Sequence, residues 1–412
     1  MWLGRNFFFF FVGTVLSSAG TAMVPVALSF AILYSGRSPT FLGVILAAQT
    51  IPTVVFLLAG GVIGDRWPRR RVMIGADALR CVTQIILAMY LVGGRSSLLP
   101  LAAMSALIGL GNAFFLPASG RLVVEIISPK LIIKANSILR LANAVALVLG
   151  PASAGVLVVW IGAGWVIGLD GVSYALSALC LLCIKVQPAV RPPAPYARRP
   201  VLHDFLEGLG AFSQRRWLWL VVGQFGLVNL FAAAPLLVIG PVMLAKLPNG
   251  VTAWGLLLSA IGVGGACGTI AIMRVRPRRP LVVMEVAVGL IVVPLFLLAF
   301  RVALPLVQIS GVCFGFGAAV LNILLMTIIQ QQVPQAVLSR VMSIVQLAAI
   351  ALVPVGYALA GPGALWLGPN LALGTGAFCV ALSILVLLSQ KEIRDFGIAQ
   401  DNEISAQPTA LR

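Results

Sequence analysis

The chain of 412 residues is 60% hydrophobic and only 9% charged, and its mean hydropathy is +1.07. Soluble domains carry about 25% charged residues, so this composition excludes a soluble protein that covers its surface with charge. The formal net charge of +17 would suit a nucleic-acid-binding protein, but the basic residues lie in short segments between apolar stretches. That distribution indicates membrane topology instead.

Apolar stretches recur along the chain at about the length that a helix needs to cross roughly 30 Å of hydrocarbon. They predict an all-α membrane protein with twelve transmembrane helices in two pseudo-symmetric six-helix halves. The alternating apolar and polar pattern of a membrane barrel is absent from the sequence. The predicted spans are 7–34, 40–64, 72–94, 98–118, 134–162, 165–185, 217–245, 252–273, 281–300, 304–328, 340–360 and 365–388.

Residues 61–71, after the second predicted span, contain four arginines and one aspartate and follow a stretch, 38–64, without any charge. Basic residues resist translocation, so loop 61–71 predicts the cytoplasmic side of the membrane, with both termini cytoplasmic. In that orientation most of the 28 lysines and arginines are cytoplasmic. The outside receives Arg37, Arg95, Lys246 and Arg301. The positive surplus therefore reflects topology, and we expect no nucleic-acid partner.

Charged residues inside predicted spans are candidates for function because charge is costly in hydrocarbon. Asp77 and Arg80, three apart in the third span, share a helix face, which predicts a local ion pair that acts together with loop 61–71. Arg140 lies about 9 Å along the fifth helix from Lys134. We expect it to face the bundle interior, either paired for structure or in contact with substrate.

Acidic residues in other spans are candidates for proton coupling. Asp170, which we place near the outer end of the sixth span, is the first candidate, and solvation at a helix end is the alternative interpretation. Glu285 lies low in the ninth span. Uncharged polar residues in spans either line a central cavity or bond across helices, and these residues are Gln49, Asn143, Gln224, Asn229, Asn322 and Gln346.

The fifth span contains small residues four apart together with a proline, in the arrangement Ala146-x-x-x-Gly150-Pro151-x-x-Ala154-Gly155. Small residues at this spacing let two helices approach closely, and the proline frees a backbone carbonyl. The pattern resembles a motif associated with antiporters, with alanine at two of its glycine positions. Ordinary tight packing is the alternative interpretation.

The chain divides in its middle. Residues 186–216 are rich in proline and basic residues and predict a cytoplasmic linker between an N-terminal half, 1–185, and a C-terminal half, 217–389, followed by a cytoplasmic tail, 390–412. An offset of 206 residues aligns 109–155 with 315–361 without a gap and superimposes four glycine pairs. Such an internal repeat is typical of transporters built from two related halves.

Loop 61–71 resembles the loop between the second and third helices of major facilitator superfamily transporters. The matching positions are Gly61, Asp65, Arg66, Arg69 and Arg70. The resemblance implies the fold of that family and a latch that supports its outward-facing conformation through contacts between arginine and carboxylate. Glu125 is then the expected partner of Arg69 or Arg70, unless these arginines only anchor topology. Pro68 departs from the family, which usually has glycine there.

Together with the stretch 135–140 and the motif at 146–155, this loop is similar to the drug:proton antiporter branch that includes macrolide-efflux and siderophore-exporter proteins. Related branches carry an arginine where this chain has Ser105, so their proton pathway does not transfer. The resemblance implies a monomeric efflux protein that exchanges protons for an amphipathic organic compound across the lipid bilayer of a bacterial inner membrane. The alternative is a proton-coupled importer or a facilitator of a small metabolite.

An enzyme or receptor with several spans is a less favoured class, because the one histidine, His203, lies in the linker without a catalytic partner. Cys180 and Cys183 are separated by two residues but lie within a span, where they serve packing. We therefore expect no metal, no cofactor and no catalytic residue. The sequence leaves the identity of the transported compound open.

Overall fold

The computed structural model describes residues 4–66, 68–185, 209–210, 212–275 and 277–397. These residues form helices without any strand, and twelve of the helical segments are long and apolar enough to cross a membrane. The predicted all-α class and the number of spans are therefore confirmed. The predicted linker and tail lie largely outside the described residues.

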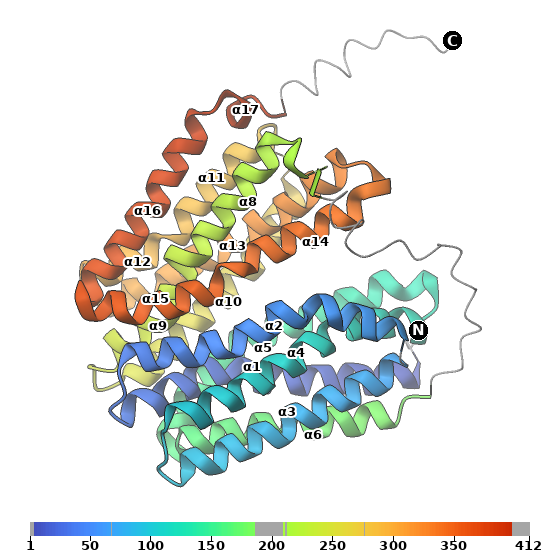
Figure 1. Ribbon diagram of the computed structural model, residues 1–412, viewed down its shortest axis with the longest axis vertical. Coiled ribbons are helices and arrows are strands. Elements are labelled where there is room, and N and C mark those ends of the chain that lie inside the picture. Colours follow the sequence, from blue (N-terminus) through green and yellow to red (C-terminus); the bar gives the residue numbers. More distant parts are fainter. Residues whose placement is uncertain (1–3, 67, 186–208, 211, 276, 398–412) are drawn as a thin grey trace.

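The first six spans are single helices that form one bundle, drawn from blue to green in Figure 1. Within this bundle α1 packs on α5 and α6, α2 packs on α4, and α3 packs on α4 and α6. The helices are α1 (Arg5–Tyr34), α2 (Pro39–Arg66), α3 (Arg69–Val92), α4 (Leu98–Ile126), α5 (Ile132–Ile161) and α6 (Ala163–Leu182). A short 3₁₀ turn, Pro129–Leu131, precedes α5.

The last six spans form the second bundle, and three of them are interrupted. The helices are α8 (Arg216–Val228) and α9 (Ala234–Leu244), separated by a π-turn at Asn229–Ala233, then α10 (Gly250–Arg274), α11 (Pro280–Ile291), α12 (Val293–Ala299), α13 (Leu304–Gln332), α14 (Gln335–Ala351), α15 (Val353–Trp366), α16 (Pro369–Ser389) and the short α17 (Lys391–Arg394). Each interruption lies just before a proline, namely Pro235, Pro294 or Pro354. Proline has no N–H to donate to the preceding turn, so it weakens the helix there.

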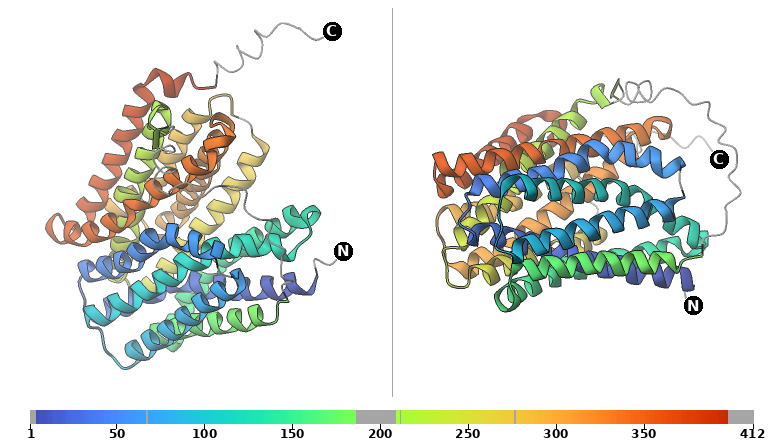
Figure 2. Two further views of the ribbon diagram at one scale, coloured as in Figure 1. Left: turned by 45° about the vertical axis from the view of Figure 1, so that its right-hand side comes forward. Right: turned by 60° about the horizontal axis from the view of Figure 1, so that its bottom comes forward.

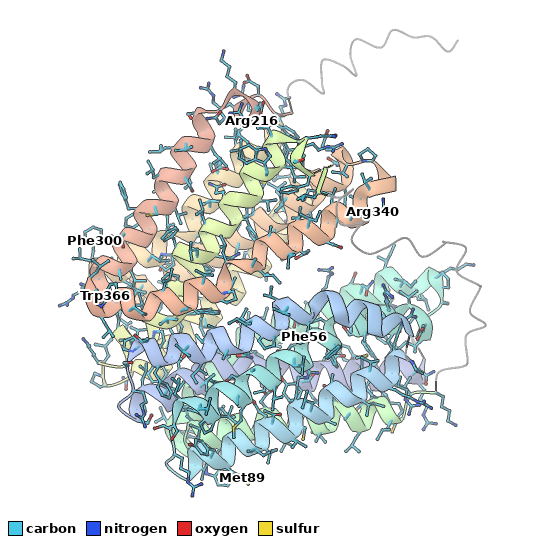
Figure 3. The ribbon with its side chains drawn as sticks, viewed as in Figure 1. Phe56, Met89, Arg216, Phe300, Arg340 and Trp366 are labelled. Atoms are coloured by element: carbon cyan, nitrogen blue, oxygen red, sulfur yellow. The ribbon has the colours of Figure 1, made fainter. Side chains whose placement is uncertain are left out.

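The helix ends define two ends of the molecule. The basic end carries the start of α1, the loop between α2 and α3, and the beginnings of α8 and α14, where Arg216 and Arg340 lie (Figure 3). The opposite end carries Phe300 and Trp366, which are 76% and 87% exposed. Large apolar side chains are also exposed on the sides of the helices, as Met89 is on α3. A surface in contact with lipid requires such side chains.

The two bundles contact each other mainly through two helix pairs, α2 with α15 and α5 with α10. Both contacts involve the parts of these helices toward the opposite end, and the ribbons diverge toward the basic end (Figures 1 and 2). Gly155 on α5 lies against Thr252 on α10, and Gly361 on α15 lies against Thr40 on α2. We call these two contacts together the seam.

The seam has the symmetry of the repeat. Gly155 and Gly361 are 206 residues apart, the offset that aligns 109–155 with 315–361. The carbonyl of Pro151 meets Gly255, and the carbonyl of Tyr357, again 206 residues later, meets Gly43. The turns at Gly162 and Gly368 have the same offset and φ values of 88° and 81°, a conformation that favours glycine. Two related halves therefore meet through equivalent surfaces.

Glycine is also required inside the second bundle, where α13 crosses α10. A Cβ atom at Gly315 would collide with the backbone carbonyl of Ile261. We expect Gly315→Val to lower stability by about 1–3 kcal/mol or more, because overpacking between two backbones cannot relax through a side chain. Thermal unfolding of the purified protein in detergent measures the effect. Gly75→Val is the matched control, since a Cβ there meets nothing within 4 Å, and equal losses for both variants would contradict this account.

Candidate functional site

A buried polar cluster lies among α1, α3, α4 and α6 of the first bundle. At one end Asp77 and Arg80, both on α3, form the predicted ion pair with side-chain exposures of 0% and 6%. Ser177 on α6 donates a hydrogen bond of 2.7 Å to Asp77 Oδ2. Arg80 Nη1 donates to Asn112 Oδ1 on α4 over 3.1 Å. The ion pair therefore ties three helices together.

Two aromatic rings cover the Arg80 guanidinium. Its Cζ atom lies 4.2 Å from the ring centre of Phe115 and 4.3 Å from that of Tyr174. A guanidinium is planar and weakly hydrated, so aromatic faces stabilise it where water is excluded. The described partners of Asp77 and Arg80 thus lie inside the bundle, and the predicted joint action with loop 61–71 stays a prediction because the side chains of 57–67 are not described.

Asp170 occupies the other end of the cluster. Its side chain accepts a hydrogen bond of 2.8 Å from Gln84 Nε2 and a longer one of 3.4 Å from Thr21 Oγ1. Thr21 also shares a 2.8 Å hydrogen bond with the Tyr174 hydroxyl. Asp170 is 1% exposed and lies two turns inside α6, deeper than its predicted place near the start of the helix.

The charges of this cluster do not cancel if both carboxylates are ionised. Arg80 is paired with Asp77, and among the described residues no cation forms an ion pair with Asp170. An ionised carboxylate without a cation is costly at this depth. The hydrogen-bonding groups around Asp170 can hold its carboxyl group with or without a proton, so Asp170 stays a candidate for proton coupling.

Arginines at the start of α3 tie the basic end of the first bundle together. Arg69 forms an ion pair with Glu125 at the end of α4. Arg70 donates two hydrogen bonds of 2.7 Å to the carbonyls of Leu181 and Leu182 at the end of α6. A cation suits the negative end of a helix dipole and satisfies carbonyls that lack a partner. Both arginines therefore bind partners within their own half.

The rest of the predicted latch lies outside the described side chains. The backbone of Gly61, Asp65 and Arg66 belongs to α2, but the side chains of residues 57–67 are not described. Their contribution stays a prediction from the sequence.

The antiporter-like motif on α5 faces two neighbours. Gly150 lies against Ala22 of α1, and Ala146 is buried in the same bundle. On another face Pro151 and Gly155 form the α5 side of the seam. Because Pro151 has no N–H, the carbonyl of Leu147 loses its usual helical partner. That carbonyl would lie 2.8 Å from a Cβ at Gly262, so only glycine lets α10 approach it.

The remaining candidates are scattered. Asn229, in the π-turn, donates a 2.8 Å hydrogen bond to the carbonyl of Ala349, so it bonds across helices. Gln49 is half-buried on α2. The side chains of Arg140, Asn143, Asn322 and Gln346 are exposed. Arg140 lies eleven residues before Pro151, about three helical turns, and so shares the face of α5 that meets α10 further along.

Several members of the buried cluster were not singled out in the sequence, namely Thr21, Gln84, Asn112, Tyr174 and Ser177. A helical stripe offers a signal for some of them, because 77, 80 and 84 share one face of α3 and 170, 174 and 177 share one face of α6. Thr21 and Asn112 also have polar neighbours at helical spacing, Thr14 and Ser17 on α1 and Ser105 and Ser119 on α4. Among the described residues no group of His, Cys, Asp and Glu is placed to hold a metal.

Comparison with known proteins agrees with this architecture. The family model of the Major Facilitator Superfamily matches residues 10–356. The Multidrug efflux pump Tap of Mycolicibacterium fortuitum is 27% identical over 387 residues, covering 90% of this chain and 91% of that protein. The Enterobactin exporter EntS of Escherichia coli O9:H4 (strain HS) is 26% identical over 402 residues, covering 94% and 92%.

Solved structures share the fold at low sequence identity. The nucleoside transporter NupG superimposes with a TM-score of 0.74 at 12% identity, covering 93% of this chain and 98% of that one. A bacterial homologue of the iron transporter ferroportin superimposes with a TM-score of 0.71 at 16% identity, covering 93% and 99%. At these identities the likeness concerns the fold alone.

The Asp77–Arg80 pair leads to a stability prediction. Arg80→Gln alone leaves Asp77 buried without a cation, and we expect a loss of roughly 3–5 kcal/mol. The double variant Asp77→Asn, Arg80→Gln removes both charges and should lose less than Arg80→Gln does. Thermal unfolding of the three purified proteins in detergent tests this order. A double variant less stable than the single one would show that the pair is not the stabilising contact.

Proposed function

This chain belongs to the Major Facilitator Superfamily, and on that premise we propose that it is a secondary active exporter working by proton antiport and alternating access. The proposed substrate is an amphipathic organic compound of the drug, antibiotic or siderophore type. The observation that carries the proposal is similarity over nearly the whole chain to proteins named as a multidrug efflux pump and an enterobactin exporter. The chain is a transporter and not an enzyme.

The arrangement of the two bundles supports alternating access. Small residues at the seam join the halves at the opposite end, so the halves can rotate against each other without disturbing their cores. We propose that the basic end faces the cytoplasm of a bacterial inner membrane. In that orientation the helix ribbons of the two bundles diverge toward the cytoplasm (Figure 1), which is the arrangement expected of the state that receives a compound for export.

Within this proposal we assign roles to residues from their contacts and their chemistry. Asp170 is the proposed carrier of a coupling proton, because it is buried and no cation in the described part of the chain forms an ion pair with it. Arg140 lies on the same face of α5 as the seam residues, about three turns closer to the basic end. We propose that it contacts the substrate. The ties made by Arg69 and Arg70 keep the first half rigid, so that it moves as one body. The protein is proposed to act as a monomer.

An import function is the second candidate, since proteins of this fold include the nucleoside transporter NupG and the POT family transporter PepTSo. The two candidates differ in the direction of net movement. Cells that express the protein should accumulate less of at least one compound from a panel of antibiotics, dyes and siderophores that includes enterobactin. An uncoupler should abolish the difference, because it removes the proton gradient. Accumulation that rises on expression, or efflux that persists with the uncoupler, would contradict proton-driven export.

Loop 61–71 gives a prediction that separates insertion from transport. The second half repeats its basic residues at Arg278 and Arg279 but has Arg274 where the first half has Asp65. We expect Asp65→Asn to insert normally and to lower efflux by about tenfold or more, the effect of losing one charge-assisted hydrogen bond of the proposed latch. Membrane abundance and topology reporters measure insertion beside efflux. Arg71→Gln is the matched control, and equal losses of efflux in both variants would contradict a specific role for Asp65.

A further inference from the structure

The second bundle buries one charged side chain among its described residues, that of Glu285 on α11. Glu285 is 1% exposed. It lies five residues after Pro280, the first residue of α11, which corresponds to about 8 Å along the helix. The carboxyl group is therefore inside the span and not at its end.

Neutral groups surround this carboxyl. Gln224 Nε2 on α8 donates a 2.6 Å hydrogen bond to Glu285 Oε2 and lies 3.3 Å from Ser383 Oγ on α16. Ser383 itself donates to the carbonyl of Val380 in its own helix. Both ion pairs found in the described part of the chain belong to the first bundle, so neither involves Glu285.

The helices packed around α11 bring few titratable groups. α12 contributes none, and α13 and α16 contribute Cys313 and Cys379. The charged residues nearby in the sequence lie at the basic end, before α11, at the start of α8 and on α17. They are Arg215, Arg216, Arg278, Arg279, Lys391, Glu392 and Arg394.

The repeat shows how the two halves differ. Ser177 and Ser383 are 206 residues apart, the offset between 109–155 and 315–361. Ser177 donates to Asp77, which Arg80 neutralises. Ser383 lies beside the Gln224–Glu285 pair, where no guanidinium is present among the described residues. Each half therefore buries a carboxyl group near its equivalent serine, Asp77 near Ser177 and Glu285 near Ser383. Among the described residues, only Asp77 is paired with a cation.

Glu285 instead resembles Asp170 in its surroundings. Each accepts a hydrogen bond from a glutamine amide, 2.8 Å for Gln84 with Asp170 and 2.6 Å for Gln224 with Glu285. An amide N–H can bond to the carbonyl oxygen of a neutral carboxylic acid as well as to a carboxylate. The same geometry therefore accommodates the group with and without its proton.

We propose that Glu285 is a second proton-binding site, located in the second half and separate from Asp170. The proton is bound as a neutral carboxylic acid while α8, α11 and α16 exclude water, and it leaves as a hydrated proton when the half moves and water reaches the group. This inference rests on the proposed proton antiport. It adds a second site at which a proton is bound and released in each transport cycle.

Infrared spectroscopy of the purified full-length protein tests the site without any transport. The carbonyl stretch of a protonated carboxylic acid should be present in the wild type, weaker in Glu285→Gln, and unchanged in Glu392→Gln, which removes an exposed carboxyl on α17. Glu285→Asp should retain the band at a shifted frequency, which covers the case that Glu285→Gln fails to fold. A band that is the same in the wild type and in both Glu285 variants would overturn the proposal.

Transport in proteoliposomes gives the second measurement, with ethidium and enterobactin as the probes. A pH gradient should drive uptake by the wild type, and Glu285→Gln should lower this uptake by about tenfold, while counterflow without a gradient falls less. Equal gradient-driven uptake by the wild type and Glu285→Gln would overturn the role of Glu285. A wild type that moves the probes without responding to the gradient would instead overturn proton antiport, while the infrared band would still locate a proton site.

Discussion

The hydrocarbon core of the bilayer offers no hydrogen-bonding partner, and the architecture of this protein follows from that constraint. Backbone groups are satisfied within helices, so every span is helical. A charged side chain is not satisfied by the backbone hydrogen bonds of its own helix and needs partners on neighbouring helices. Arg80 illustrates the requirement, because Asp77, Asn112 and two aromatic rings from three helices surround it. The buried charges therefore also fix how these helices pack.

The same constraint explains why the two halves meet through small residues. Helices in lipid gain little from burying apolar side chains against each other, so close packing of backbones takes over. At the seam Gly255 meets the Pro151 carbonyl, and Gly43 meets the Tyr357 carbonyl. The arginine ties of Arg69 and Arg70, in contrast, stay within one half. Two rigid bundles that meet through small residues, without ion pairs of Arg69 or Arg70 between them, are suited to rock against each other. Alternating access requires this motion.

The two halves are related in fold but differ in chemistry. Their seam residues and the turns at Gly162 and Gly368 follow one offset. The acid of loop 61–71, the proline of the α5 motif and the Asp77–Arg80 pair occur in the first half, whereas in the second half no described cation forms an ion pair with Glu285. Geometry is thus shared because the halves must pack against each other, whereas the buried charges, which do not form this contact, differ between the halves.

The sequence by itself determined the class, the number of spans and the repeat, because apolar length and glycine spacing are local properties. It also predicted the Asp77–Arg80 pair, since residues three apart on a helix must be neighbours. Which helices approach each other was decided by the tertiary structure. That is why Thr21, Gln84 and Asp170, and likewise Gln224 and Glu285, came together only there, and why Arg70 bonds to the end of α6 rather than to Glu125. Contacts between distant segments depend on the packing of whole helices, which no local spacing encodes.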